Sequence, residues 1–378
     1  MGKRANRAVR LLAVGDIALP AGATTRGVLV HESMQGVIKQ ADIVVANLES
    51  PCRGGEPALG KINLYMEENA VQRIKDMGIG AVSLANNHVL DYGSEGAERT
   101  VALLKHAGVG YFGLVESETP QTPLIVHVRG LELGFLGYVS PAVGTVFATG
   151  CSIGPARLSV ESVLHEVKQL KGNCDYVLVS LHWGLEHQYF PTPKQVEVAR
   201  RIVDAGADVV LGHHAHVFQG VECYRHGCIF YGLGNFTFPD YEVASFYNAT
   251  GGHAVKRGSW SYWGQHSLAP LVELPGRPSP ARISEVFFTR LEPGTDELKV
   301  LCGPSAAKLR RRLSILTAPL SWASYRACWQ VLKRYCHLVA AANVLKKKGG
   351  LRSIPTASNL REAIRRVIGG RSDEGNGV

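Results

Sequence analysis

The chain has 378 residues, of which 46% are hydrophobic and 19% are charged. This balance is ordinary for a globular protein with a large core, and it excludes a chain that is disordered throughout. The formal net charge is +9, but residues 305–378 hold 15 Lys and Arg against 3 Asp and Glu. The positive charge therefore belongs to a C-terminal extension, and the mildly acidic main body gives no indication of nucleic-acid binding.

The sequence shows no segment typical of membrane insertion or secretion. No uninterrupted apolar stretch approaches the ~18 residues of a spanning helix, and the run Val9–Val14 is too short for a signal peptide. The eight cysteines have no metal-binding or disulfide-framework spacing, although Cys223 and Cys228 could face each other across a hairpin. We predict free thiols in a cytoplasmic protein whose basic extension could lie against a membrane.

Apolar, β-branched runs alternate with helical patterns, which predicts a largely parallel sheet with strands buried on both faces. In chain order, the predicted strands are Val9–Val14, Asp42–Leu48, Ala81–Ala85, Glu132–Val139, Tyr176–Leu181, Asp208–Leu211 and Cys228–Tyr231. The predicted helices between them are Gly27–Gln40, Glu67–Met77, Ser94–Ala107, Ser159–Leu170 and Lys194–Ala205. Later strands at Ser267–Glu273 and Ile283–Arg290 indicate a second, partly antiparallel sheet packed on the first.

From about Lys308 onward the chain is basic and its apolar residues recur at helical spacing. Aromatic residues repeat every three or four positions from Trp322 to Trp329, and this stripe could dock on the body or lie on a membrane surface. We predict a main domain of residues 8–303, a helical basic extension of residues 304–368 and a disordered tail of residues 369–378.

Polar side chains of the kinds that bind metals follow five predicted strands at the point where each strand ends. They are Asp16, Glu49, Asn87, His182, His214 and His216. One such residue alone is more often a turn or helix-cap residue. In parallel α/β sheets, however, the carboxyl ends of the strands meet at one edge, where ligands bind. Five such endings together therefore predict one metal or polar active site.

The ligand types narrow the choice of metal. Carboxylate, amide oxygen and imidazole together suit Mn, Zn or Fe and disfavour Ca or metals that prefer thiolates. A carboxylate that bridges two ions is the usual way to build a two-metal site, and Glu49 has candidate ligands on both sides of it. We predict one or two divalent ions.

Several short motifs carry a resemblance to a known family. They are Val14–Asp16, Ala46–Glu49, Leu84–His88 with Asp91–Gly93, Ser180–Gly184, Gly212–Val217 and Phe230–Phe236. In this order they resemble the CapA (PgsA) family of capsule and poly-γ-glutamate synthesis proteins, over about Leu11 to Asp240. The resemblance implies a fold like that of calcineurin-like metallophosphoesterases. That fold is an α/β, four-layer α/β/β/α sandwich over a two-metal site, here followed by the helical basic extension.

The resemblance also implies roles for individual residues. One ion would be held by Asp16, Glu49 and His216, and the other by Glu49, Asn87, His182 and His214. The catalytic residues would be Asp16, His88 and Asp91, and Asp91 would orient the His88 ring. His213, Trp183 and Glu186 would contact substrate. The sequence departs from the phosphoesterase pattern because Asp16-Ile17-Ala18 lacks a histidine and Glu49 replaces an aspartate, so the first ion site is one ligand short.

Three functions stay open at this point. The first is a metal-dependent hydrolase of amide, γ-glutamyl or phosphate ester bonds, with His88 as general acid. The second is a metal-assisted peptide epimerase, similar to those of lasso-peptide pathways, in which Asp16 and either His253 or His266 exchange an α-proton. The third is an accessory protein of polymer synthesis or export. The expected partners are a peptide or anionic polymer substrate and, through the basic tail, a membrane-associated synthase.

Overall fold

The computed structural model describes residues 8–19, 29–116, 120–148, 152–248 and 251–347. Two sheets dominate it, and both have parallel strands at their centre. The nine-stranded sheet consists of β1 (Val9–Ile17), β2 (Leu29–Val30), β3 (Ile43–Leu48), β4 (Ala81–Ser83), β5 (Gly110–Phe112), β14 (Asn235–Thr237), β17 (His266–Leu274), β18 (Arg282–Glu292) and β19 (Glu297–Val300). The six-stranded sheet consists of β7 (Leu124–Val128), β8 (Leu131–Val139), β10 (Tyr176–His182), β11 (Val209–His213), β12 (Val221–Tyr224) and β13 (Gly227–Phe230).

Two small antiparallel pairs and a set of helices complete the described chain. The pairs are β6 (Leu114–Glu116) with β9 (Ile153–Pro155), and β15 (Tyr241–Phe246) with β16 (His253–Gly258). The α-helices are α1 (Glu32–Ile38), α2 (Asn69–Asp76), α3 (Gly93–Ala107), α4 (Val160–Lys171), α5 (Pro193–Asp204), α6 (Gly303–Thr317) and α7 (Tyr325–Lys347). Short 3₁₀ helices are η1 (Pro141–Val143), η2 (Tyr262–Gln265) and η3 (Ala318–Ser321).

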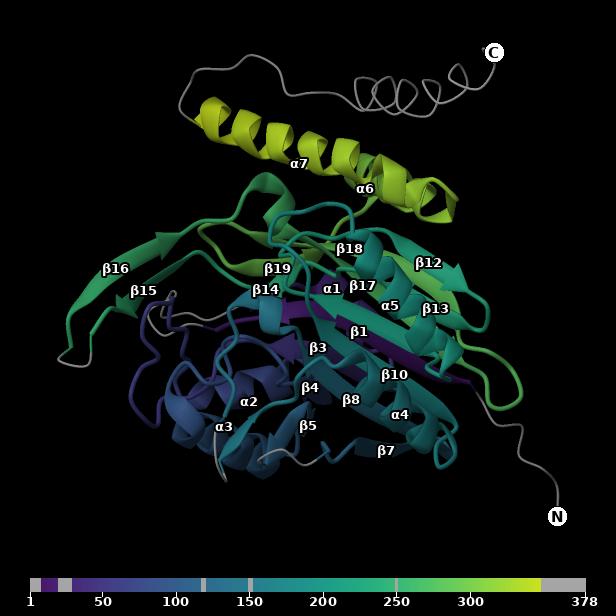
Figure 1. The fold of residues 1–378 in the computed structure, drawn as a ribbon, viewed down its shortest axis with the longest axis horizontal. Helices are drawn as coiled ribbons and strands as arrows, with labels where there is room; N and C mark the ends of the chain where they lie inside the picture. Colours follow the sequence, from purple (N-terminus) through teal and green to yellow (C-terminus); the bar gives the residue numbers. More distant parts are fainter. Residues whose placement is uncertain (1–7, 20–28, 117–119, 149–151, 249–250, 348–378) are drawn as a thin grey trace, which may run out of the picture.

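The two faces of β1 show how the layers stack. Leu12 and Val14 point into a core that is shared with α1, α2 and α3. Leu11 and Ala13, on the opposite face, belong to the core that contains β8, β10, β11 and the helices α4 and α5. The layers therefore run helices, nine-stranded sheet, six-stranded sheet, helices (Figure 1), and the predicted four-layer α/β/β/α sandwich is confirmed.

Most predicted elements form, with ends shifted by a few residues, but their predicted division between sheets is wrong. The seven strands expected in one sheet are divided between two, and Ser267–Glu273 and Ile283–Arg290 form β17 and β18, which extend the sheet that contains β1.

The predicted start of the first helix is also wrong. Leu29–Val30 instead forms β2, which pairs with β19, and the helix begins only at Glu32. The His31 side chain caps this helix by accepting from the Ser33 N–H, which stabilises the start at that point. The hairpin β15–β16 was not predicted from the sequence.

The C-terminal extension is helical as far as it is described, and its aromatic stripe docks on the body. Tyr325, Trp329 and Leu332 are buried in the same core as β10 and α5, and the Tyr325 hydroxyl donates to the Pro191 carbonyl. The part of the extension beyond Lys347, including the predicted tail 369–378, lies outside the described residues. Among the described helices, none combines the length and apolar character needed to cross a membrane.

Arg312 on α6 fastens the extension through aromatic rings. Its guanidinium carbon lies 3.6 Å from the centre of the Trp263 ring and 4.3 Å from that of Tyr189. We expect Arg312→Ala to lower the free energy of unfolding by about 2 kcal/mol, because a partly desolvated cation–π contact is lost. Urea denaturation would measure this, with Arg310→Ala at the exposed neighbouring position as the control. Equal stability of the two variants would contradict the expectation.

Candidate metal centre

The carboxyl ends of strands from both sheets meet at one place. Asp16 lies near the end of β1 and pairs with Asn47 of β3, while His182 ends β10 and pairs with His213 of β11. The His213 Nδ1 lies 3.0 Å from Asp16 Oδ1, so the two sheets are joined by a side-chain contact. The sequence prediction that distant polar residues converge here is confirmed at this point of the structure.

Asn47 is the hub of the buried part of the site. Its Nδ2 donates to Asp16 Oδ1 at 2.9 Å and to Glu49 Oε1 at 3.2 Å, and it lies 3.3 Å from His182 Nδ1. All four residues are buried. Asn47 had no role in the sequence prediction, although it lies near the end of β3, two residues before Glu49.

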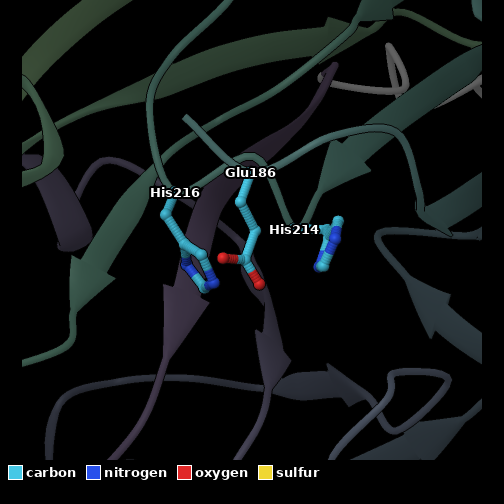
Figure 2. Close-up of side chains that lie close together, drawn as sticks. All are labelled: Glu186, His214 and His216. Atoms are coloured by element: carbon cyan, nitrogen blue, oxygen red, sulfur yellow. The ribbon is translucent and has the colours of Figure 1, made fainter. Parts of the chain in front are cut away.

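Two groups of three side chains could each hold a cation. One consists of Asp16, Glu49 and His182, and in it the candidate donor atoms all lie within 4.8 Å of one another. The other meets the same 4.8 Å limit and consists of Glu186, His214 and His216, where Figure 2 shows the Glu186 carboxylate between the two imidazoles. These groups differ from the two ligand sets implied by the resemblance, because Glu186 joins His214 and His216.

Among the buried side-chain atoms of the described chain that lack a hydrogen-bond partner, two belong to these groups. They are Glu49 Oε2 and His214 Nδ1, one from each group. Leaving a buried polar atom unpaired typically costs ~1–3 kcal/mol, so native proteins rarely leave such atoms without a partner. A divalent cation would satisfy both atoms, and carboxylate and imidazole are ligands that Mn, Zn and Fe accept. The donor set therefore fits a divalent metal.

The electrostatics of the site also suit a cation. Burial, and secondly the nearby Asp16 carboxylate, raise the pKa of Glu49 well above its usual value. Burial, followed by neighbouring imidazoles, keeps the pKa of His182 well below its usual value and lowers that of His214 to about 4. Both histidines are thus neutral near pH 7, which is the form that binds metal. A bound cation would favour the ionised form of Glu49.

The remaining predicted ligands lie against these groups. Asn87 Oδ1 is 2.9 Å from His182 Nε2, so the asparagine side chain lies directly against the ring of this candidate ligand. His216 Nδ1 lies 2.9 Å from Asn235 Oδ1, and its ring packs against Trp260 at a tilt of 43°, with centroids 4.8 Å apart. Such contacts orient an imidazole for metal binding.

His88 and Asp91 form a hydrogen-bonded pair, as the resemblance implies. His88 Nδ1 lies 2.7 Å from Asp91 Oδ2, and Asp91 is fully buried. Burial lowers the pKa of His88 although Asp91 opposes this shift. The imidazole is therefore neutral near pH 7, with its Nδ1 proton on the carboxylate side and its Nε2 able to accept a proton. This differs from the expected resting form of a general acid.

The surroundings of Trp183, His266 and His253 differ from those expected of substrate-binding or proton-exchanging residues. Trp183 belongs to the hydrophobic core and its ring N–H donates to the Tyr231 carbonyl at 3.4 Å, which differs from the expected substrate contact. His266 is buried against the Tyr262 carbonyl at 2.6 Å. His253 is exposed on β16 beside Phe246. Neither of these two histidines belongs to a three-donor group.

The backbone around the histidines is unusual. His214 and His216 have φ values of 83° and 53°, a region that non-glycine residues rarely adopt. Such conformations cost of order 1–3 kcal/mol each and cluster at functional sites, where the surrounding structure holds them. With this backbone, Ala215 lies in the hydrophobic core, while the imidazoles of His214 and His216 lie on either side of the Glu186 carboxylate (Figure 2).

The part of the chain that builds this site matches a known protein family. A family model described as "Bacterial capsule synthesis protein PGA_cap" matches residues 10–240. The chain belongs to this family. The resemblance predicted from the motifs is thereby confirmed, and all the candidate ligands lie within the PGA_cap match, whereas α6 and α7 lie outside it.

Individual relatives agree with the PGA_cap assignment. The chain is 32% identical over 252 residues to the capsule biosynthesis protein CapA of Bacillus anthracis, with 62% of this chain and 61% of that protein covered. It is 32% identical over 226 residues to a probable polyglutamine synthesis accessory protein of Mycobacterium tuberculosis, covering 56% of this chain and 58% of that protein. The chain thus spans about three fifths of the length of the curated relatives it matches.

Among solved structures, the NAD nucleotidase of Haemophilus influenzae is similar, with a TM-score of 0.44 and 14% sequence identity. The alignment covers 81% of this chain and 62% of that one.

Proposed function

We propose that this chain is a metal-dependent hydrolase of capsule or poly-γ-glutamate-type polymer metabolism, which cleaves amide, γ-glutamyl or phosphate ester bonds. The observation that carries the proposal is the pair of unpartnered buried atoms, Glu49 Oε2 and His214 Nδ1, in two adjoining three-donor groups. The expected cofactor is one or two ions of Mn, Zn or Fe, and the expected substrate is a peptide or an anionic polymer.

The side chains divide the work as follows. Asp16, Glu49 and His182 would hold one ion, and Glu186, His214 and His216 would hold another, as their donor atoms group in the structure. When bound, a divalent ion supplies a Lewis acid and lowers the pKa of water towards 7. Asn87 Oδ1 lies 2.9 Å from His182 Nε2 and so orients the ring, with Nδ1 4.0 Å from Glu49 Oε1, before substrate binds.

His88 is suited to move the proton. The Asp91 contact fixes the His88 ring through Nδ1 and leaves Nε2 free for the reacting groups. In hydrolysis, Nε2 would take a proton from the attacking water and return it to the leaving amine or alkoxide as the C–N or P–O bond breaks. The backbone fold of the His88–Asp91 turn, where the Asp91 N–H donates to the His88 carbonyl at 2.9 Å, keeps the two side chains together.

Metal analysis tests the proposal first. Protein purified without chelator is expected to carry about one or two Mn, Zn or Fe ions per chain, measured by inductively coupled plasma mass spectrometry. His214→Ala is expected to lose most of this metal, whereas His127→Ala, an imidazole whose side chain is 71% exposed on β7, is expected to keep it. A wild-type protein that binds no divalent metal would refute the proposal.

The reaction is tested with γ-glutamyl peptides and model phosphodiesters. Turnover that disappears in His214→Ala and persists in His127→Ala is expected for a hydrolase. Deuterium uptake at a substrate α-carbon without bond cleavage would instead indicate an epimerase. Retained metal with neither reaction, together with co-purification of a polymer synthase, would indicate an accessory role.

A further inference from the structure

Lys61 extends the His88–Asp91 pair into a chain of three charged or polar side chains. The Lys61 ammonium lies 2.6 Å from Asp91 Oδ1, and it also donates to the Asn87 carbonyl. The other Asp91 oxygen, Oδ2, receives His88 Nδ1 at 2.7 Å and the Leu64 N–H at 2.7 Å. The Lys61 side chain is only 17% exposed and that of Asp91 is fully buried. Neither oxygen of the Asp91 carboxylate is therefore left to solvent.

Lys61 also contacts Asn87, which lies against the candidate metal ligand His182. Its bond to the Asn87 main chain fixes the residue whose side-chain oxygen lies 2.9 Å from His182 Nε2. The Lys61 ammonium therefore contacts both Asn87, which lies against His182, and Asp91, which is hydrogen-bonded to His88. Residues in this position, behind the ligands, set the orientation of a metal site although they do not bind the ion.

The segment that carries Lys61 is held by the β15–β16 hairpin, which extends from the body of the molecule (Figure 1). The Ser245 hydroxyl of β15 donates to the Lys61 carbonyl at 2.9 Å. On either side, the Gly60 N–H donates to the Phe246 carbonyl at 2.8 Å and the Asn63 N–H to that of Ala244 at 3.3 Å. The hairpin therefore acts as an added strand along the lysine segment.

We propose that Lys61 is a positioning residue of the metal centre, held in place by the β15–β16 hairpin, and that it fixes Asn87 and the His88–Asp91 pair together. The part that concerns Asn87 rests on the proposed metal-dependent function. A buried carboxylate needs a compensating charge, and Lys61 supplies it to Asp91 as an ion pair at 2.6 Å. Because a lysine side chain is flexible, the hydrogen bonds from β15 to the main chain around Lys61 are needed to fix the position of its ammonium.

Metal affinity is the first readout. Mn²⁺ and Zn²⁺ dissociation constants would be measured by competition with a chromophoric chelator for wild type, Lys61→Met and Lys61→Arg. We expect Lys61→Met to weaken binding by ~10–100-fold, the range typical for residues behind metal ligands, and Lys61→Arg to recover most of the loss. Lys256→Met, which removes an exposed ammonium from β16, is the matched control and is expected to bind like wild type.

A second readout does not depend on metal or turnover. The proton on His88 Nδ1, held by Asp91, should give a downfield NMR signal that is assigned by its loss in His88→Gln. We expect this signal to shift or disappear in Lys61→Met and to persist in Lys61→Arg and Lys256→Met. If wild type binds no metal, the proposed function fails, and this signal still tests the hold of Lys61 on His88 and Asp91.

The proposal is overturned if folded Lys61→Met keeps both the wild-type metal affinity and the wild-type His88 signal. Should Lys61→Met fail to fold, Ser245→Ala provides the test, because it removes one contact of the hairpin with the lysine segment and no contact with the site. Weaker metal binding or a shifted His88 signal in Ser245→Ala would support the role of the hairpin, and wild-type values in both would contradict it.

Discussion

Glu49→Gln is expected to abolish tight metal binding while making the metal-free protein more stable. The substitution keeps the size of the side chain but removes a ligand that lies within one three-donor group. We expect the metal dissociation constant to rise by at least ~100-fold, beyond the ~10–100-fold typical for residues behind the ligands. Competition with a chelator measures the affinity, and Glu98→Gln on the exposed side of α3 is the control.

The stability change in chelator-treated protein has a defined pH dependence. Burial, and secondly the Asp16 carboxylate, raise the pKa of Glu49 in the folded state. An acid whose pKa is raised by folding opposes folding once the pH exceeds its unfolded pKa of about 4.3, and the opposition grows until the folded pKa is passed. Glu49→Gln should therefore raise the free energy of unfolding at pH 8 and have little effect at pH 4. A variant less stable than wild type at pH 8 would contradict this.

Gly15→Ala is expected to prevent folding. A Cβ atom at this position would lie 1.7 Å from the Gly234 carbonyl oxygen, which belongs to the main chain and accepts from the Asp16 N–H at 2.9 Å. Neither backbone can move without separating β1 from the segment that leads into β14, so we expect a loss of more than ~4 kcal/mol in the free energy of unfolding. Circular dichroism and soluble yield would measure the loss.

Gly36→Ala is the matched control for this substitution. Gly36 lies in helix α1, and a Cβ added there meets no atom within 4 Å. Because glycine is unfavourable inside a helix, we expect Gly36→Ala to stabilise the protein by about 0.5–1 kcal/mol. If both alanine variants fold with wild-type stability, the close approach at Gly15 is not required.

Regular patterns in the sequence predicted most strands and the convergence of the site, whereas the four-layer arrangement was implied by the family resemblance. Continuous apolar runs identify buried strands, and polar residues at their ends must meet at the sheet edge. His182 and Asp16 end strands of different sheets, so their approach depends also on how the two sheets pack on each other. The grouping of Glu186 with His214 and His216 could not be foreseen, because it depends on the irregular backbone that follows β10 and β11.

The sequence gives little or no indication of two other contacts, those of Asn235 and Lys61. Asn235 stands in a motif that was recognised, yet its contact with His216 depends on how β14 pairs beside β1. Lys61 lies in a segment between strands and helices, and a single lysine in such a segment is most often a solvated charge. Only its approach to Asp91, under the cover of β15, distinguishes it.

The docking of α6 and α7 has a consequence for how the molecule unfolds. Leu309, Leu316 and Leu332 share one continuous apolar interior with the six-stranded sheet, so the basic helices are not an independent appendage. Removing them would leave apolar surface around Phe218 exposed to water and favour aggregation. We therefore expect the family-matched region and the helices up to residue 336 to melt in a single cooperative transition, with no separate step for the extension.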